Sequence, residues 1–227
     1  MNILGLDLSL NGPGFCPFPH IVSSLTMTTK DGDRRYVRIR DAIEHYLCQA
    51  TSWRGQTRQI RYDLAMIEAV PPYATSTASL ERVHGVAREV LARYGVPFVY
   101  VSPTTLKLYA VGDGKAEKQQ MIDALPPALA KTATDDEADA WWLADMGRTA
   151  GGDIVLWHTL PEHRIAALNK VAGWPPAFSP AVIHHASSTK VVQCGHGYYC
   201  LVNAGRLLHP YLLDVCDKPA KPKTRSK

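Results

Sequence analysis

Four carboxylate residues that lie far apart in the chain each have strongly apolar neighbours. Asp7 follows the apolar run at residues 3–6, and Glu68 follows a second run at residues 64–67. Asp136 and Asp139 lie three residues apart, just before two tryptophans. A buried carboxylate is costly unless a cation compensates its charge. Because divalent metals are the usual compensators, the four residues predict one metal site.

Each of these acids also has a structural explanation that involves no metal. Asp7 could be a turn residue at a strand end, and Glu68 a solvated strand end. Asp135 and Glu137 suit the start of a helix, where acids favour the helix dipole. Asp139 fits that explanation poorly, because it lies past the first turn and among alanines and tryptophans. The four acids together, at strand ends and on one helix face, favour the metal site.

A cluster of four carboxylates suits one type of reaction in particular. It can hold two Mg²⁺ ions about 3.5–4 Å apart, and Mn²⁺ is expected to substitute. One ion would activate a water, and the other would stabilise the leaving oxygen of an in-line phosphodiester displacement. The sequence contains no Walker-type glycine loop, so no nucleotide cofactor is expected.

Apolar patterns and breaking residues predict the elements that must position these acids. Strands are expected at residues 2–8, 62–70 and 96–101, with two short strands within residues 15–28. A polar stretch with Arg54, Arg58 and Arg61 precedes the middle strand. The alternation of strands and helices indicates an α/β domain with a mixed sheet. The sequence predicts its helices at residues 33–50, 75–94, 115–125 and 135–147.

Two local signals refine these elements. Along the first strand, Gly5 and Asp7 share one face, because side chains alternate across a strand. Thr134 and Glu137 have the spacing of a capping box, which places the start of the last helix at about Asp135.

Residues 2–148 resemble the RuvC-like Holliday junction resolvases of the ribonuclease H-like fold. The resemblance rests on the strand ends at Asp7 and Glu68, on the run Asp136–Ala140, and on the segments at 102–107 and 112–118. It implies a mixed five-stranded sheet flanked by helices. It also implies an endonuclease that cuts four-way or other branched DNA and acts as a homodimer, since paired cuts need two sites. Outside the resemblance, residues 189–216 have the pattern of a β-hairpin or small meander, so a small β-rich C-terminal extension is expected.

The resemblance also assigns residues outside the acidic set. Lys107 and Lys118 match lysines that contact the DNA backbone near the active site, which implies phosphate contact or transition-state stabilisation. Lys115, in the same segment, is expected to bind DNA as well. Tyr73 could stack on an unpaired base, although a packing or turn role is an equal alternative. The loop at residues 11–17 departs from the family pattern of a clean second strand.

Two other functions remain open from the sequence. One is a nuclease of the same fold that acts on flaps, replication forks or RNA–DNA hybrids. The other is a non-cleaving nucleic-acid-binding or scaffold protein. The clustered acids argue against the second, because a protein that only binds phosphate gains nothing from clustered negative charge.

Composition and charge predict three parts: a nuclease domain at 1–152, an extension at 153–216 and a basic tail at 217–227. The net charge of +4 resides in that tail, which is typical of disorder. It could attract phosphate backbones or only aid solubility. The extension suggests a divergent member, of bacteriophage origin. Its Cys and His residues could form a structural Zn²⁺ site or be ordinary small and surface residues: His184, His185, Cys194, His196, Cys200, His209 and Cys216.

The chain shows neither a secretory signal nor an apolar stretch long enough to span a bilayer. A cytoplasmic protein is therefore expected, in the host cytoplasm if the origin is a phage, with reduced cysteines and no membrane partner.

Overall fold

The computed structural model describes residues 1–17, 21–53, 56–71, 77–151, 160–175 and 178, and the backbone of strands at 190–193, 199–203 and 206–207. Backbone contacts divide the chain into two units, Met1–Ser179 and Pro180–Lys227. The described elements of the first unit are β1 (Ile3–Asp7), β2 (Gly14–Cys16), β3 (Ser23–Ser24), the 3₁₀ helix η1 (Thr29–Asp31), α1 (Arg34–Leu47), β4 (Ala50–Trp53), β5 (Gln56–Gln59), β6 (Leu64–Glu68), α2 (Thr77–Arg93), β7 (Phe98–Val101), α3 (Pro103–Val111), α4 (Lys118–Asp123), α5 (Pro127–Ala130), α6 (Asp135–Ala150) and α8 (Glu162–Lys170).

The main sheet has five strands in the order β3-β2-β1-β6-β7, which confirms the predicted mixed α/β fold. β1, β6 and β7 are parallel, whereas β2 and β3 run antiparallel to their neighbours. Leu6 of β1 lies opposite Ile67 of β6, so the next residue of each strand reaches the same edge of the sheet. Those next residues are Asp7 and Glu68.

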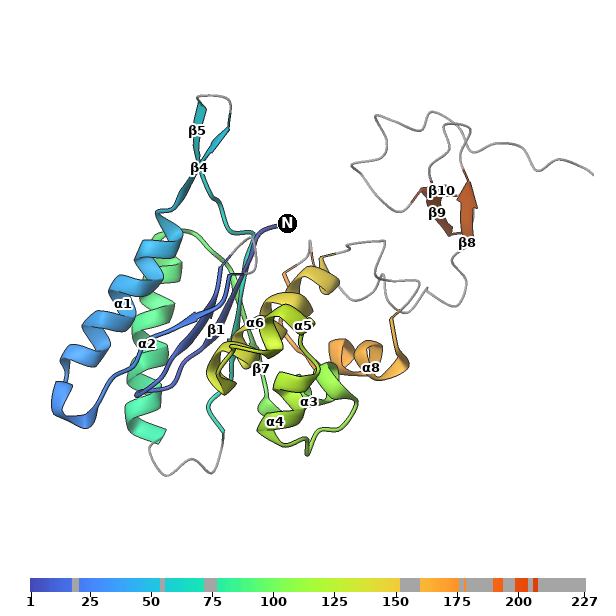
Figure 1. Ribbon diagram of the computed structural model, residues 1–227. Coiled ribbons are helices and arrows are strands. Elements are labelled where there is room, and N and C mark those ends of the chain that lie inside the picture. Colours follow the sequence, from blue (N-terminus) through green and yellow to red (C-terminus); the bar gives the residue numbers. More distant parts are fainter. Residues whose placement is uncertain are drawn as a thin grey trace, which may run out of the picture. The chain divides into compact units, whose positions relative to one another are not determined.

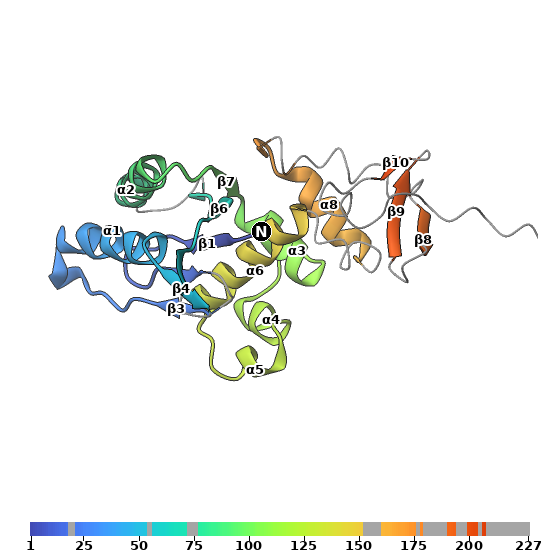
Figure 2. The same ribbon diagram turned by 90° about the horizontal axis from the view of Figure 1, so that it is seen from above.

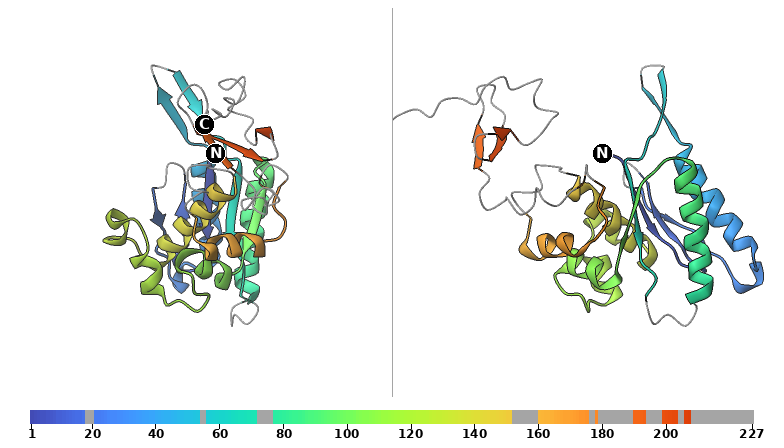
Figure 3. Two further views of the ribbon diagram at one scale, coloured as in Figure 1. Left: turned by 90° about the vertical axis from the view of Figure 1, so that its right-hand side faces the viewer. Right: turned by 180° about the vertical axis from the view of Figure 1, so that it is seen from behind.

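Helices α1 and α2 cover one face of the sheet, and α6 covers the other (Figure 1 and Figure 2). Figure 3 shows the same layers from the side and from behind. The first face packs Leu4 and Leu6 of β1 against Ile39 and Ile43 of α1 in one apolar cluster. The opposite face of β1 presents Gly5 to α6, as the alternation of the strand requires.

Helix α6 begins as the sequence predicts. The Thr134 hydroxyl accepts a hydrogen bond from the Glu137 amide at 3.3 Å, and the Glu137 carboxylate accepts one from the Thr134 amide at 2.9 Å. The predicted end at residue 147 is wrong, because the helix continues to Ala150. Its last turn includes the buried Thr149 and packs on the sheet, and this packing outweighs the low helix propensity of Gly147.

The structure adds two elements that were not predicted and shortens one predicted helix. The polar stretch before the middle strand forms the hairpin β4–β5, which pairs only with itself and extends away from the main sheet (Figure 1). Its strand sequences, Ala50–Trp53 and Gln56–Gln59, carry no apolar alternation to reveal it. The helix predicted at 115–125 is shorter, Lys118–Asp123. Pro127 ends that region but also starts α5, because proline fits the first helical position.

Helix α8 packs against α3, so the first unit includes chain beyond residue 152. Its Arg164 lies over the rings of Tyr109 and Trp142, at 4.8 and 5.1 Å from their centroids. The same guanidinium reaches the buried Asp145 at 3.4 Å, and the Tyr109 hydroxyl donates to that carboxylate at 2.9 Å. This cluster joins α3, α6 and α8.

The second unit contains a three-stranded antiparallel sheet of β8 (Lys190–Gln193), β9 (Tyr199–Asn203) and β10 (Arg206–Leu207). This arrangement confirms the small meander that the sequence predicts. The cysteines and histidines considered for zinc have side chains outside the described residues. None of the described helices is both long and apolar enough to cross a membrane.

Candidate metal centre

Two adjacent parallel strands and one helix bring three of the predicted acids together. Asp7 ends β1, Glu68 ends β6, and Asp139 lies in the second turn of α6, which packs across these strands. Each residue offers one carboxylate oxygen, and these three oxygens all lie within 4.8 Å of one another. Asp7 is only 7% exposed, so water compensates its charge poorly.

The fourth predicted acid, Asp136, approaches the cluster from the first turn of α6. It lies outside the group of three, but its side chain forms a hydrogen bond with Asp7. That bond contributes to the raised pKa of Asp7, and burial raises the pKa of Asp136. Asp7 forms a hydrogen bond of the same kind with Glu68. Shared protons thus reduce the repulsion between carboxylates that lie this close together.

Burial and mutual repulsion raise the pKa values of these acids. Burial raises the pKa of Asp7 well above its usual range, and the charges of Glu68 and Asp139 raise it further. Burial, followed by the charge of Asp139, raises the pKa of Glu68 to about 8. Burial and the charges of Asp135 and Asp136 raise the pKa of Asp139 to about 6. Near neutral pH the metal-free cluster thus retains protons.

A hard divalent cation fits this donor set. The cluster consists of carboxylate oxygens without nitrogen or sulfur ligands, which is the environment that Mg²⁺ and Mn²⁺ prefer. The raised pKa values show that the site needs positive charge, which protons supply when no metal is bound. A divalent cation can replace those protons, because metal ligands bind in their deprotonated form.

The predicted basic residues lie at different distances from the acids. Lys107, on α3 and partly buried, lies close enough for its charge to lower the pKa values of Glu68 and Asp139. Lys118, exposed at the start of α4, forms an ion pair with Asp135. Its charge also lowers the pKa values of Asp136 and Asp139. The structure thus brings both lysines to the carboxylate edge.

Two further predicted contacts cannot be placed in the cluster. Lys115 is exposed, and its amide donates to the Asp113 carboxylate at 2.9 Å. Tyr73 lies outside the described residues. Asp135 and Glu137, expected to act only at the helix start, hold Lys118 and Ser24 respectively.

Three glycines near the acids allow the site to form, and no such role was predicted for them. A Cβ on Gly5 would lie 2.0 Å from the Ala140 carbonyl oxygen, and one on Gly14 would lie 2.0 Å from the Asp136 carbonyl oxygen. A Cβ on Gly12 would lie 2.7 Å from the Asp136 carboxylate. These glycines let α6 approach the strands closely enough for its acids to meet Asp7. A glycine inside an apolar strand was the available signal.

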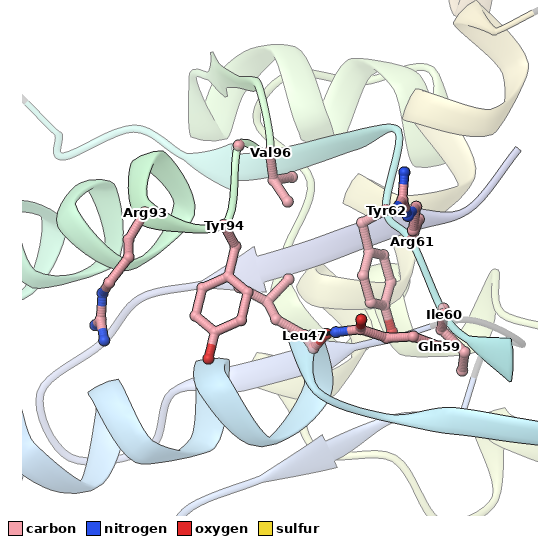
Figure 4. A pocket seen from close by; sticks show the side chains of 9 residues that line it. Leu47, Gln59, Ile60, Arg61, Tyr62, Arg93, Tyr94 and Val96 are labelled. Atoms are coloured by element: carbon pink, nitrogen blue, oxygen red, sulfur yellow. Dashed lines mark hydrogen bonds between the residues drawn. The ribbon is translucent and has the colours of Figure 1, made fainter. Parts of the chain in front are cut away.

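A cleft of about 560 Å³ lies at the other end of the sheet, beside the start of β6. It lies between the ends of α1 and α2 and the segment 59–62, and Tyr62 and Tyr94 line it (Figure 4). Arg93 also lines it, but this guanidinium pairs with Glu44 at 2.6 Å. Among the described residues, none of the predicted site residues lines this cleft.

The five-stranded mixed sheet, with acids at adjacent strand ends and on the facing helix, defines a ribonuclease H-like α/β protein. The chain is 35% identical over 154 residues to the crossover junction endodeoxyribonuclease RuvC of Prochlorococcus marinus (strain MIT 9303), covering 65% of this chain and 97% of that protein. It is 34% identical over the same length to RuvC of P. marinus (strain MIT 9313), again covering 65% and 97%. The chain therefore belongs to the RuvC family of crossover junction endodeoxyribonucleases.

Other comparisons give weaker similarity. A Thermus thermophilus RuvC structure covers 63% of this chain and 91% of its own, at 15% identity and a TM-score of 0.49. T. thermophilus RuvC in complex with a Holliday junction substrate gives 17% identity and the same TM-score, with 63% and 90% coverage. No family model matches the chain.

Proposed function

We propose that this protein is a Mg²⁺-dependent endodeoxyribonuclease that cuts four-way DNA junctions. The observation that carries the proposal is the meeting of Asp7, Glu68 and Asp139, whose oxygens lie within 4.8 Å of one another. The repulsion between its members costs stability, and a bound divalent cation would both relieve that repulsion and give the cluster a catalytic use. Membership in the RuvC family directs this metal chemistry to the phosphodiester bonds of crossover DNA.

The four acids would have different roles in metal binding. Asp7, Glu68 and Asp139 would bind directly, and Asp136 would either share a second ion or orient Asp7. When bound, the metal supplies charge neutralisation and a water nucleophile of lowered pKa, in a two-ion displacement if both positions fill. The protons that Asp7 and Glu68 hold would go to solvent on metal binding, because carboxylates bind a metal in their charged form.

The lysines act on the phosphate rather than on the metal. Lys107 is partly buried beside Glu68, where its charge would stabilise the transition state of the attacked phosphate. Lys118 and Lys115, both exposed, would contact the DNA backbone. Tyr73 retains its proposed role of stacking on an unpaired base.

The proposal extends to assembly and organisation. A junction has two symmetric strands to cut, so we propose a homodimer with one site per protomer. The nuclease domain would comprise residues 1–152, with an extension at 153–216 and a basic tail at 217–227. Because the substrate is DNA, we place the protein in the cytoplasm, or in the host cytoplasm for a phage protein.

Cleavage of defined DNA by the full-length protein tests the proposal. Labelled four-way junction, flap, linear duplex and RNA–DNA hybrid are incubated with Mg²⁺, with Mn²⁺ or with chelator. We expect cleavage of the junction, a loss of about 10²-fold or more in Asp7→Asn and Asp139→Asn, and near wild-type rates in Asp123→Asn. Asp123 is an exposed carboxylate on α4 and serves as the matched control.

The outcomes separate the alternatives. Flap or hybrid cleavage without junction cleavage would replace the substrate but keep the metal centre. Binding of junction without cleavage of any substrate would favour a non-cleaving DNA-binding protein. Unchanged rates in both metal-site variants would refute the assignment of the acids. Sedimentation of the junction complex tests the dimer, and a mass with one protein chain would refute it.

A further inference from the structure

A basic surface on η1 and the start of α1 has no part in the metal centre described above. It consists of Lys30, Arg34, Arg35 and Arg38, and we call it the α1 arginine surface. Lys30, Arg34 and Arg38 are exposed, and Arg35 is partly buried. Residues 30–40 contain five basic and two acidic residues. One of the two acids, Asp31, accepts hydrogen bonds from the amide and hydroxyl of Thr28 at 2.6 and 3.1 Å.

Stability of the helix does not explain this surface. Positive charges in the first turn of a helix oppose its dipole, and α1 has no acidic residue in its first turn. Among the described residues, no carboxylate oxygen lies within 4 Å of the charged groups of the α1 arginine surface. Two other arginines behave differently, since Arg40 of α1 pairs with Asp41 at 2.7 Å and Arg93 of α2 pairs with Glu44 at 2.6 Å.

The α1 arginine surface is tied to the loop that supports the metal centre. Arg35 donates from Nη1 to the Asn11 side chain at 3.1 Å. The next residue, Gly12, lies so close to Asp136 that a Cβ would come within 2.7 Å of its carboxylate. The Asn11 carbonyl also accepts a bond from the Met27 amide at 2.8 Å, which holds the segment before α1 against this loop. Arg35 and Asp136 thus contact neighbouring residues of one loop, Asn11 and Gly12 respectively.

The carboxylate edge consequently has positive charge on two sides. α1 lies on one face of the sheet, whereas α3 and α4, with Lys107 and Lys118, lie on the other side with α6 (Figure 1 and Figure 2). β1 and β6 are parallel and end at Asp7 and Glu68, and Figure 1 shows the start of α1 and helix α4 toward this same end of the sheet. A polyanion whose cleaved phosphate sits at this edge can contact both groups.

We propose that the α1 arginine surface binds the phosphate backbone of a DNA arm that leaves the cut site on the α1 side. This inference rests on the proposed function. Arg34 and Arg38 are separated by about one helical turn, or 5.4 Å along the axis, so both can meet phosphates of one strand. Arg35 positions the surface against the loop, and no base contact is needed, because phosphate contacts set position and orientation without reading sequence.

Salt-dependent DNA binding by the full-length protein tests this surface. Labelled junction and linear duplex are titrated in the uncleaving Asp139→Asn background, with Mg²⁺ and at several KCl concentrations. The variant is Arg34→Gln/Arg38→Gln, which spares Arg35 and its bond to Asn11. The control is Arg40→Gln/Arg93→Gln, which removes equal charge from α1 and α2 away from the surface and also probes the cleft lined by Arg93.

We expect the variant to bind about tenfold more weakly, with the slope of log K against log salt smaller in magnitude by about 2, since each phosphate contact contributes about 0.9. The control should keep the parent slope. An equal slope in variant and parent, or an equal loss of affinity in the control, would refute DNA binding by the α1 arginine surface. If the wild type binds DNA without cutting any, the nuclease proposal fails, but the salt slopes still show whether the α1 arginine surface binds DNA. If it binds no DNA, both fail.

Discussion

The backbone of β1 touches the backbone of α6 where Gly5 faces Ala140. A Cβ placed on Gly5 would lie 2.0 Å from the Ala140 carbonyl oxygen and 2.9 Å from the Ala144 nitrogen. Both obstacles are main-chain atoms, which cannot rotate away as a flexible side chain can. Asp139 immediately precedes Ala140, and Asp7 shares the Gly5 face of β1. The contact therefore sets how closely the acids of the helix approach the acids of the sheet.

Gly5→Ala should therefore damage both stability and catalysis. The added methyl group must push α6 from β1, and we expect a loss of at least about 3 kcal/mol in unfolding free energy. Junction cleavage should fall by more than the folded fraction does, because Asp139 moves away from Asp7. Urea denaturation and single-turnover cleavage measure the two effects.

Gly85→Ala on α2 is the matched control, because the nearest atom to its added Cβ is a flexible Arg88 nitrogen at 4.0 Å. Alanine should leave stability unchanged or raise it by up to about 1 kcal/mol in a helix. Equal losses in both variants would show that the close approach of α6 is not the cause.

Glu68→Gln should stabilise the metal-free protein, and more so as pH rises. The folded pKa of Glu68 is about 8 and its ordinary value is 4.5. Between these values the folded protein binds a proton that the unfolded chain has lost, so wild-type stability falls as pH rises through this window. Glutamine removes that loss. We expect a gain of about 1–3 kcal/mol near pH 8 and little change near pH 4.5.

Thermal unfolding at several pH values, in chelator and in Mg²⁺, measures this effect. Mg²⁺ should stabilise the wild type more at pH 8 than at pH 6, because protons compete with the metal, and should stabilise Glu68→Gln much less. Exposed Glu81→Gln is the control and should follow the wild type. A pH-independent difference between Glu68→Gln and wild type would refute the raised pKa.

Lys107→Met should slow cleavage without weakening DNA binding appreciably. Its charge acts on Glu68 and Asp139 from a partly buried position, so it belongs to the reaction centre rather than to the outer binding surface. We expect the single-turnover rate to fall by about 10²–10³-fold. Exposed Lys115→Met should weaken junction binding instead and leave the saturated rate near wild type. The reverse pattern would contradict this division.

Arg164→Met tests the cluster that joins α8 to α3 and α6. Methionine retains apolar contact with Tyr109 and Trp142 but leaves Asp145 without its cation. We expect a loss of about 1–3 kcal/mol, reduced from the fully buried case because the Arg164 side chain is 22% exposed. Adding Asp145→Asn should restore part of the loss, which urea denaturation can measure.

Arg40→Gln, which breaks an exposed ion pair with Asp41, is the control and should cost under about 0.5 kcal/mol. Additive losses in the Arg164 and Asp145 double variant would show that the two side chains do not interact.

Much of the site could be predicted, because the free-energy cost of a carboxylate beside a buried strand depends on residues close to it in sequence. A carboxylate after an apolar strand is unfavourable wherever that strand folds, so Asp7 and Glu68 could be singled out from their neighbours alone. Parallel strands then bring such ends to one edge. The capping box likewise depends on residues three apart, which is why the start of α6 at Asp135 was predicted correctly.

Only the tertiary structure decided which residues from distant parts of the sequence lie beside the acids. Nothing near Gly5 in sequence indicates that Ala140 will rest against it, and nothing near Arg35 indicates Asn11. The α8 contact and the hairpin β4–β5 escaped prediction for the same reason. Hydrophobic periodicity indicates which side of a helix or strand is apolar, but not which other element packs against that side. The sequence therefore determined the chemistry of the acids, and long-range packing determined their separation, their protonation and the basic surface beside them.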